Sequence, residues 1–495
     1  MGIIFKQSLR NTLIIYLGFL IGGINTVVLY ARFLKEEYYG LVTLVLSTSN
    51  LVMPLMALGI HFTIVKFFSS YDKKEQKDRF LSSIIFFPLI IAIIIGYFWN
   101  YFHILIMKFL SEDNVVVENY TLYIYIVAIS CAYFEVFYSW AKVQMQSVFG
   151  NFLKELYNRI AVMILLCAVY FEIITKQEFV IYLSYAYVIR TIIMSTYALK
   201  LYAPKFYFGV PDNFKEVIRY SLYIILAGSA SAIILDIDKL MIGGKDTLSV
   251  AAYYAVAVFI GSFIEAPSRA MTQILDPLTS KSINEDNNEE VVSLYKKSSI
   301  NLMLVGGLFF VLVNTNVTEL FKIMPEGYAG GELVVFFISC AKLFNMSLGN
   351  NRAIINNSKY YRITLFNGLG MALMLVYLNK YFYYDLNYGT EGLAFATFLS
   401  IIFFGLFKTW FVHHKLKMFP FTLKTILQLT IIVGFYFVFN YWNFNVPELN
   451  VYRFNISPII NIILKSVIII ILYMTVVIKL KVSDQINDVI KRFIK

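Results

Sequence analysis

The chain consists largely of consecutive apolar runs, each close to the roughly 20 residues that a helix needs to cross a bilayer. The runs are continuous rather than alternating, which excludes the strands of a membrane β-barrel. Only 15% of the residues are charged, against about 25% in an ordinary soluble domain. We therefore predict an all-α polytopic membrane protein with about 14 transmembrane helices, over residues 12–34, 41–65, 81–102, 119–138, 156–171, 179–199, 220–242, 250–275, 299–320, 333–348, 363–378, 392–412, 425–442 and 459–478.

With this helix assignment, loops that are rich in Lys and Arg alternate along the chain with loops that contain few. Of the 42 Lys and Arg residues, thirty lie on the side of the N-terminus, nine lie on the opposite side and three lie within predicted helices. Because Lys and Arg are retained on the cytoplasmic side, the pattern predicts that both termini are cytoplasmic. The net charge of +11 is spread over many loops rather than gathered on one soluble face, so we expect no nucleic-acid partner.

Motifs for soluble or metal-dependent chemistry are absent from the sequence. It contains no GxxxxGK[ST] phosphate-binding loop, no HExxH zinc motif and no GxSxG nucleophile motif. Cys131, Cys167 and Cys340 all lie within apolar runs and lack metal-ligand or redox spacing. We therefore expect no metal, no cofactor and no enzymatic activity.

Two regions of the chain share an order of features that indicates an internal repeat. In "ARFLKEEYYGLVTL" and "LDIDKLMIGGKDTLSVAAYYAVAV" a long helix, a short loop and a Tyr-Tyr pair follow one another. Pro54 and Pro267 lie fifteen and thirteen residues after these tyrosines, within apolar runs. They predict kinks, and their matched positions favour a hinge role, although transmembrane helices also tolerate proline without such a role. The predicted organisation is an N-terminal six-helix lobe (1–205), a C-terminal six-helix lobe (206–418), two added helices (419–481) and an amphipathic cytoplasmic tail (482–495).

The same segments carry a family resemblance. "LDIDKLMIGGKDTLSVAAYYAVAVFI" resembles the helix 7–8 signature of polysaccharide repeat-unit flippases of the O-antigen type, in the multidrug/oligosaccharidyl-lipid/polysaccharide exporter superfamily. "FLKEEYYGLVTL" and "YGTEGLAFATFLS" are similar to the family's helix 1–2 junction and the start of its helix 12. The resemblance implies two lobes around a cavity, alternating access, and a lipid-linked oligosaccharide as cargo. It also implies a bacterial cytoplasmic (inner) membrane, a role in lipopolysaccharide or other surface polysaccharide biosynthesis, and membrane lipids, a polysaccharide polymerase and glycosyltransferases as further partners.

Charges inside the predicted helices are the candidate functional residues. A charge at mid-bilayer costs roughly 2.5–3.5 kcal/mol on insertion scales, so such residues tend to be paired or functional. Arg190 is the twelfth residue of its 21-residue predicted helix and is our first candidate for binding an anionic substrate group. The alternative is a structural ion pair, for example with Glu135.

Further candidates lie in the second half of the chain. We predict substrate binding by Arg269 and Lys342, and a role in ion coupling or ion pairing for Glu135, Asp236, Asp238 and Glu265. Glu265 and Arg269 are four residues apart and could neutralise each other, while Asp236 and Asp238 are two apart, so at most one should face a cavity. Lys465, near a helix end, is expected to extend toward the membrane surface.

Several functions remain open at this stage. A flippase for an isoprenoid-pyrophosphate-linked oligosaccharide is favoured by the resemblance. A lipid II flippase and a cation-coupled drug exporter of the same superfamily are alternatives, and the two added helices argue against the exporter. A membrane glycosyltransferase or polymerase is the alternative of another class, and the short predicted outer loops argue against it.

Overall fold

The computed structural model describes residues 3–110, 112–207, 209–442, 444, 446–451 and 454–483. The predicted amphipathic tail therefore lies, from residue 484 on, outside the described residues. The chain divides into two compact units, Met1–Ala255 with Gly368–Val376, and Val256–Asn367 with Tyr377–Lys495. The predicted division into lobes at residue 205 stays a prediction.

The all-helical membrane fold is confirmed. Among the described residues, twelve helical stretches are long and apolar enough to cross a bilayer. The pair α16 (Glu332–Ser347) and α17 (Asn351–Asn357), bent by 53° at a short break, brings the number to thirteen if it is counted as one span. The remaining predicted helix, over 156–171, is also helical: it covers the last two residues of the π-helix η4 (Leu153–Tyr157) and all of α10 (Asn158–Tyr170). The only strands in the part of the chain that the structure describes are a two-residue pair, β1 and β2, with Asn450 opposite Asn455.

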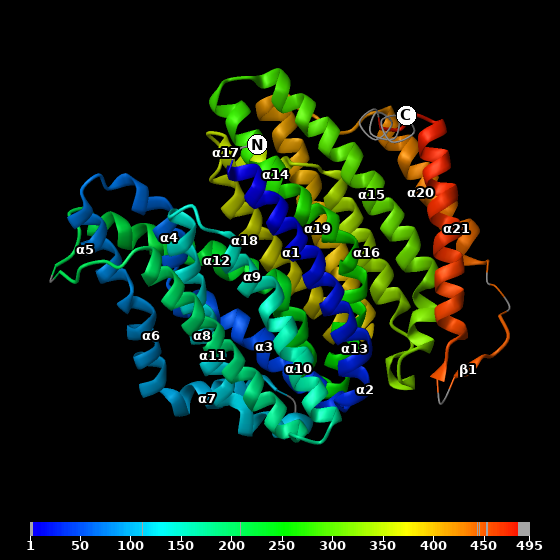
Figure 1. Cartoon of the computed structure of the whole chain (residues 1–495), viewed down its shortest axis with the longest axis horizontal. Coiled ribbons are helices and arrows are strands. Elements are labelled where there is room, and N and C mark those ends of the chain that lie inside the picture. Colours follow the sequence, from blue (N-terminus) through cyan, green and yellow to red (C-terminus); the bar gives the residue numbers. More distant parts are fainter. Residues whose placement is uncertain are drawn as a thin grey trace. The chain divides into compact units, whose positions relative to one another are not determined.

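The first unit is built from the helices in the N-terminal half of the chain (Figure 1). Its elements are α1 (Ile3–Gly23), η1 (Ile24–Tyr30), α2 (Ala31–Phe33), α3 (Glu36–Ala57), α4 (Ile60–Phe67), η2 (Phe68–Ser70), α5 (Lys74–Ile84), α6 (Phe86–Tyr97), α7 (Trp99–Phe109), η3 (Glu112–Tyr120), α8 (Thr121–Val143), α9 (Val148–Phe152), η4 (Leu153–Tyr157), α10 (Asn158–Tyr170), α11 (Lys176–Leu201) and α12 (Phe214–Gly243). α13 (Leu248–Ser262) begins in this unit, and α18 (Ile363–Asn379) contributes its middle residues.

Helix α8 is the centre of the first unit, because it packs against α3, α4 and α11. Its buried residues are mostly apolar, as expected for a helix with packed neighbours on most sides. Ala128 and Ala132 are fully buried beside Met56 and Ala57 of α3, and these small side chains let the two helices approach closely. The central position of α8 places one of its faces against the cavity described below.

The predicted helix over 41–65 is divided into two helices by a break after Pro54, the proline at which a kink was predicted. Helix α3 ends at Ala57, Leu58 and Gly59 adopt positive φ angles of 46° and 67°, and α4 begins at Ile60. A Cβ on Gly59 would lie 2.8 Å from the carbonyl oxygen of Ser221 on α12, so this turn needs glycine for both its conformation and its close contact. The hinge role of Pro54 stays a prediction, now located next to an observed break.

The predicted helix over 250–275 is also interrupted, just before its proline. A 3₁₀ turn, η5 (Phe263–Glu265), separates α13 from α14 (Ala266–Asn284), and Pro267 lies in the first turn of α14. Proline fits a first turn because its missing N–H has no intrahelical partner there. Both prolines singled out in the sequence therefore lie near helix breaks.

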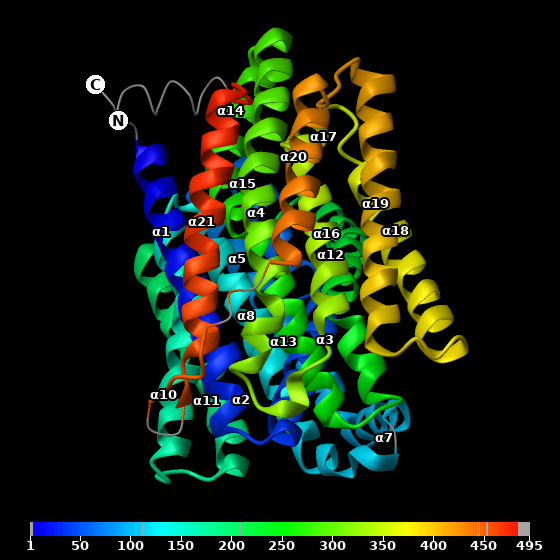
Figure 2. The same cartoon turned by 90° about the vertical axis from the view of Figure 1, so that its right-hand side faces the viewer.

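The second unit comprises the remaining helices of the C-terminal half. They are η5, α14, α15 (Asn288–Lys322), η6 (Glu326–Tyr328), α16 (Glu332–Ser347), α17 (Asn351–Asn357), η7 (Lys380–Asp385), α19 (Gly389–Leu416), α20 (Leu423–Asn440), β1 (Asn450–Val451), β2 (Phe454–Asn455) and α21 (Ser457–Lys479). The long helix α15 packs against α16, α20 and α21, and Figure 2 shows α20 and α21 on either side of it.

Lys465 corrects one sequence expectation. Its side chain does not extend to the membrane surface: the residue is 3% exposed, and its Nζ donates to the carbonyl oxygen of Thr315 at 2.7 Å. The reason is the rotation of α21, which turns this position toward α15 rather than toward lipid. Lys465 thus connects α21, one of the two added helices, to α15.

A close backbone contact in the first unit gives a prediction on stability. A Cβ on Gly40 would lie 1.8 Å from the carbonyl oxygen of Leu248, and backbone atoms cannot move aside as flexible side chains do. We expect Gly40→Ala to lower the stability by about 3 kcal/mol, at the upper end of overpacking effects. Thermal unfolding of the purified protein in detergent measures this. Gly434→Ala on α20 is the control, because a Cβ there meets no atom within 4 Å; equal losses in both variants would contradict the steric explanation.

Candidate functional site

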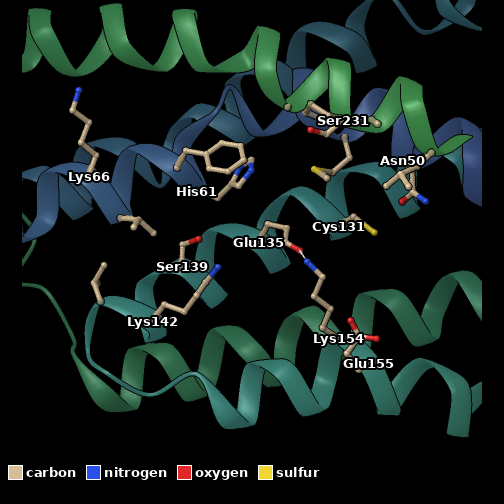
Figure 3. Close-up of a pocket in the computed structure, with 18 of the residues that line it drawn as sticks. Asn50, His61, Lys66, Cys131, Glu135, Ser139, Lys142, Lys154, Glu155 and Ser231 are labelled. Atoms are coloured by element: carbon tan, nitrogen blue, oxygen red, sulfur yellow. Dashed lines mark hydrogen bonds and ion pairs between the residues drawn. The ribbon is translucent and has the colours of Figure 1, made fainter. Parts of the chain in front are cut away.

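The first unit contains a cavity of about 1030 Å³ between α3, α4, α8, η4, α11 and α12. Figure 3 shows residues of α4 and α8 facing each other across it, with Lys154 entering from η4. Seven charged side chains line it: Lys66, Glu135, Lys142, Lys154, Glu155, Arg190 and Asp236. So many charges around one space within a membrane protein mark it as the candidate site.

Helix α8 presents a polar face to the cavity. Glu135, Ser139 and Lys142 are spaced four and three residues apart, so they lie on one side of the helix. The Glu135 carboxylate accepts a hydrogen bond from Lys154 Nζ at 2.6 Å (Figure 3). Glu135 is therefore not paired with Arg190, which was the structural alternative in the sequence, because η4 brings a lysine to it first.

Arg190 reaches the cavity from near the middle of α11 and is only 5% exposed. Its guanidinium carbon lies 4.1 Å from the ring centre of Phe134 and 4.7 Å from that of Tyr187, and Nη2 contacts Cys131 Sγ at 3.4 Å. Its Nε is buried with no hydrogen-bond partner, and no carboxylate of the described residues forms an ion pair with it. The aromatic rings hold the guanidinium in place without neutralising it, which leaves the cation available to an anion.

Two lysines complete the positive lining. Lys142 Nζ lies 4.2 Å from the ring centre of Tyr138, and Lys66 Nζ lies 3.8 Å from that of Tyr220. Neither lysine forms an ion pair with a described residue. Lys142, Lys154 and Arg190 lie around Glu135, and we call these four residues the cationic wall.

The α12 side of the cavity is different, because its carboxylate is balanced locally. Asp236 accepts from Lys239 Nζ at 2.7 Å and from Asn50 Nδ2 at 3.1 Å. Asp238 is buried away from the cavity lining and accepts from the hydroxyl of Tyr254 at 2.5 Å. Only one of the two aspartates lines the cavity, as their spacing indicates.

The remaining predicted site residues lie in the second unit and do not line this cavity. Glu265 contacts Lys342 at 2.7 Å and Arg269 at 3.9 Å. This one carboxylate therefore forms ion pairs with the two cations of this unit that were predicted to bind substrate. Among the described residues, no group of three or more His, Cys, Asp or Glu side chains is arranged to hold a metal ion.

The sequence reasoning missed several residues that the structure brings into the cavity. Lys66, Lys142 and Lys154 lie just outside the predicted helices 41–65, 119–138 and 156–171, so they were expected in loops on the side of the N-terminus. In the structure Lys142 lies in the last turn of α8, and Lys154 lies within the helical stretch that follows. The spacing of Glu135, Ser139 and Lys142 was the available signal.

Comparisons with known proteins agree with this architecture. The sequence model of a family described as polysaccharide biosynthesis protein matches residues 8–267, more than half of the chain. No curated protein sequence matches.

Solved structures show the fold. A lipid II flippase, MurJ, in an inward closed conformation is similar with a TM-score of 0.71 at 14% identity, over 97% of this chain and 100% of that chain. A transporter of the MOP superfamily from Pyrococcus furiosus is similar with a TM-score of 0.57 at 13% identity, and a MATE protein in complex with MaL6 with 0.56 at 14%. In both comparisons the matched region covers 88% of this chain and 97% of the solved chain.

Proposed function

This chain belongs to the polysaccharide biosynthesis protein family, and on that premise we propose that it is a flippase for an isoprenoid-pyrophosphate-linked oligosaccharide. The cargo is a repeat unit of a surface polysaccharide of the O-antigen type. The carrier moves it from the inner to the outer leaflet of a bacterial cytoplasmic membrane, with both termini of the chain in the cytoplasm. The protein transports its cargo and is not an enzyme.

The cationic wall is the observation that carries this proposal. A pyrophosphate diester has two ionised oxygens, one on each phosphorus, and therefore a charge of −2 near neutral pH. The cationic wall sets three cations, Lys142, Lys154 and Arg190, against one carboxylate, Glu135. The seven charged side chains that line the cavity together carry +1. Charge-assisted hydrogen bonds to phosphate are about twice as strong as neutral ones, so this wall suits the pyrophosphate better than it suits a cationic drug.

A polar cavity removes the main barrier to transfer. Each sugar hydroxyl that loses its hydrogen bonds in hydrocarbon costs several kcal/mol, whereas the cavity offers polar partners while the isoprenoid chain stays in lipid. An inside-negative potential favours outward movement of the anion by about 2.3 kcal/mol per charge per 100 mV.

Coupling to an ion is a further part of the proposal. Lys154 donates a hydrogen bond to Glu135 beside the cavity. When Lys154 turns to the pyrophosphate, Glu135 loses that partner and can take up a proton or another cation. Asp236, Asp238 and Glu265 have cationic or hydroxyl partners and are secondary candidates, and Pro54 and Pro267 are the candidate hinges.

The test is transfer across a bilayer. The purified protein is reconstituted in vesicles with a fluorescent undecaprenyl-pyrophosphate oligosaccharide in the inner leaflet, and an impermeant quencher reports its arrival outside. We expect transfer well above that of protein-free vesicles and of vesicles with an unrelated membrane protein. Transfer equal to these two controls would refute the proposal.

A lipid II flippase is the second candidate, because MurJ matches over nearly all of both chains. Lipid II also carries a pyrophosphate, so the cationic wall fits both cargoes. Competition in the same vesicles separates them: excess unlabelled lipid II should displace the labelled glycan lipid only weakly if the cargo is a polysaccharide repeat unit.

A further inference from the structure

The α12 side of the cavity carries small and hydrogen-bonding side chains between the larger Tyr220 and Leu235. On α12, Gly228, Ser231 and Ala232 follow one another at spacings of three and one, and all three line the cavity. Positions i, i+3 and i+4 share one helix face. A Cβ on Gly228 would already contact Pro54 at 3.4 Å and Phe62 at 3.7 Å, and Ala232 is buried. Ser231 is exposed, so this face is open to a bulky group at Ser231.

Two polar residues stand next to this open face. Asn50 of α3 donates its amide to Asp236 of α12 at 3.1 Å, which orients the amide and leaves its carbonyl oxygen available as an acceptor. The Asp236 charge is balanced by Lys239 at 2.7 Å. The wall therefore offers acceptors for hydroxyl groups without a strong net charge.

These features match the chemistry of a neutral sugar. A pyranose is bulky and rigid, carries several hydroxyl donors and has no charge to be neutralised. We propose that Asn50, Ser231 and Asp236 form a glycan subsite, in which the sugars adjoining the pyrophosphate lie along α12 while the cationic wall holds the pyrophosphate. This inference rests on the proposed function and adds that the carrier recognises neutral sugars, not only the anionic lipid.

The buried guanidinium of Arg190 supports a ligand in the same space. It is 95% buried, lines the cavity and has an unpartnered Nε. An anchored pyrophosphate beside Arg190 would direct its attached glycan into the remaining volume of the cavity, which α12 borders.

A steric block on α12 tests the subsite. We compare the binding of two fluorescent probes to the full-length protein in nanodiscs: undecaprenyl pyrophosphate without sugar, and undecaprenyl pyrophosphate bearing a neutral tetrasaccharide. Ser231→Trp should weaken binding of the tetrasaccharide lipid by about tenfold or more, as expected for a group that no longer fits its pocket, and change binding of the sugar-free lipid less than about twofold. Leu226→Trp is the matched control, because Leu226 is on the same helix, half exposed and outside the cavity lining.

The outcomes separate the subsite from the flippase proposal. If Ser231→Trp weakens the binding of both lipids equally, or of neither, the subsite is refuted while the pyrophosphate site stands. If the wild-type protein binds neither lipid, both proposals fail. Asn50→Ala introduces no bulk and serves as a second variant should the tryptophan impair folding; it too should weaken only the sugar-bearing lipid.

Discussion

Arg190→Gln is expected to weaken the binding of sugar-free undecaprenyl pyrophosphate by about 30-fold. Hydrogen bonds to a charged group contribute about 1.5–3 kcal/mol, and each 1.4 kcal/mol corresponds to a factor of ten in Kd. The effect is large because the guanidinium is not neutralised by a carboxylate of the described residues and is held by the rings of Phe134 and Tyr187. Binding of the fluorescent lipid to the protein in nanodiscs gives the Kd directly.

Arg190→Lys is the control for this prediction. It keeps the charge but loses the planar fork that binds phosphate through two donors and stacks on aromatic rings, so its Kd should lie between those of the wild type and the glutamine variant. An unchanged Kd in the glutamine variant would mean that Arg190 supports the packing of α8 and α11 only. The assignment of the cationic wall to pyrophosphate would then be wrong.

Glu265→Gln is expected to lower the stability of the protein by about 3 kcal/mol. Removing one member of a buried ion pair leaves an uncompensated charge, which typically costs about 3–5 kcal/mol. The side chains of Glu265 and Lys342 are each 19% exposed, so we expect a loss at the lower end of that range. The same substitution also weakens the local balance of Arg269. The midpoint of thermal unfolding in detergent measures the loss.

A second substitution identifies the cause. In Glu265→Gln with Lys342→Met, no lysine charge is left beside the glutamine, so most of the lost stability should return. If the double variant is as unstable as the single one, the Lys342 pair does not account for the effect. The result also bears on the predicted substrate role of Lys342, since a lysine that mainly balances Glu265 is less available to an anion.

The course of the chain through the membrane could be predicted well. The runs at 41–65 and 250–275 predicted helical spans with kinks at their prolines. The helices do break near Pro54 and Pro267, but the exact places, Leu58–Gly59 and η5, were not predicted. A proline removes one hydrogen bond, but where the chain then turns depends on a neighbour: Gly59 packs against the backbone of α12.

The candidate site could be predicted only in part. Arg190 was identified because a charge in the middle of an apolar run is costly wherever the helix packs. Lys154 was not identified, because a lysine near a helix end can place its charge in water at little energetic cost. Its role follows from η4 placing it 2.6 Å from Glu135.

The sequence by itself determined that this is a membrane protein of many helices and which residues carry charge into the bilayer, because hydrophobicity and the cost of burying a charge are local properties of each segment. Only the tertiary structure decided which charges are neutralised. Glu265 and Lys342 are 77 residues apart, and Asn50 and Asp236 are 186 apart; whether such residues meet depends on the rotation and packing of whole helices. That packing leaves Arg190 without a carboxylate among the described residues, and so makes it the first residue to test.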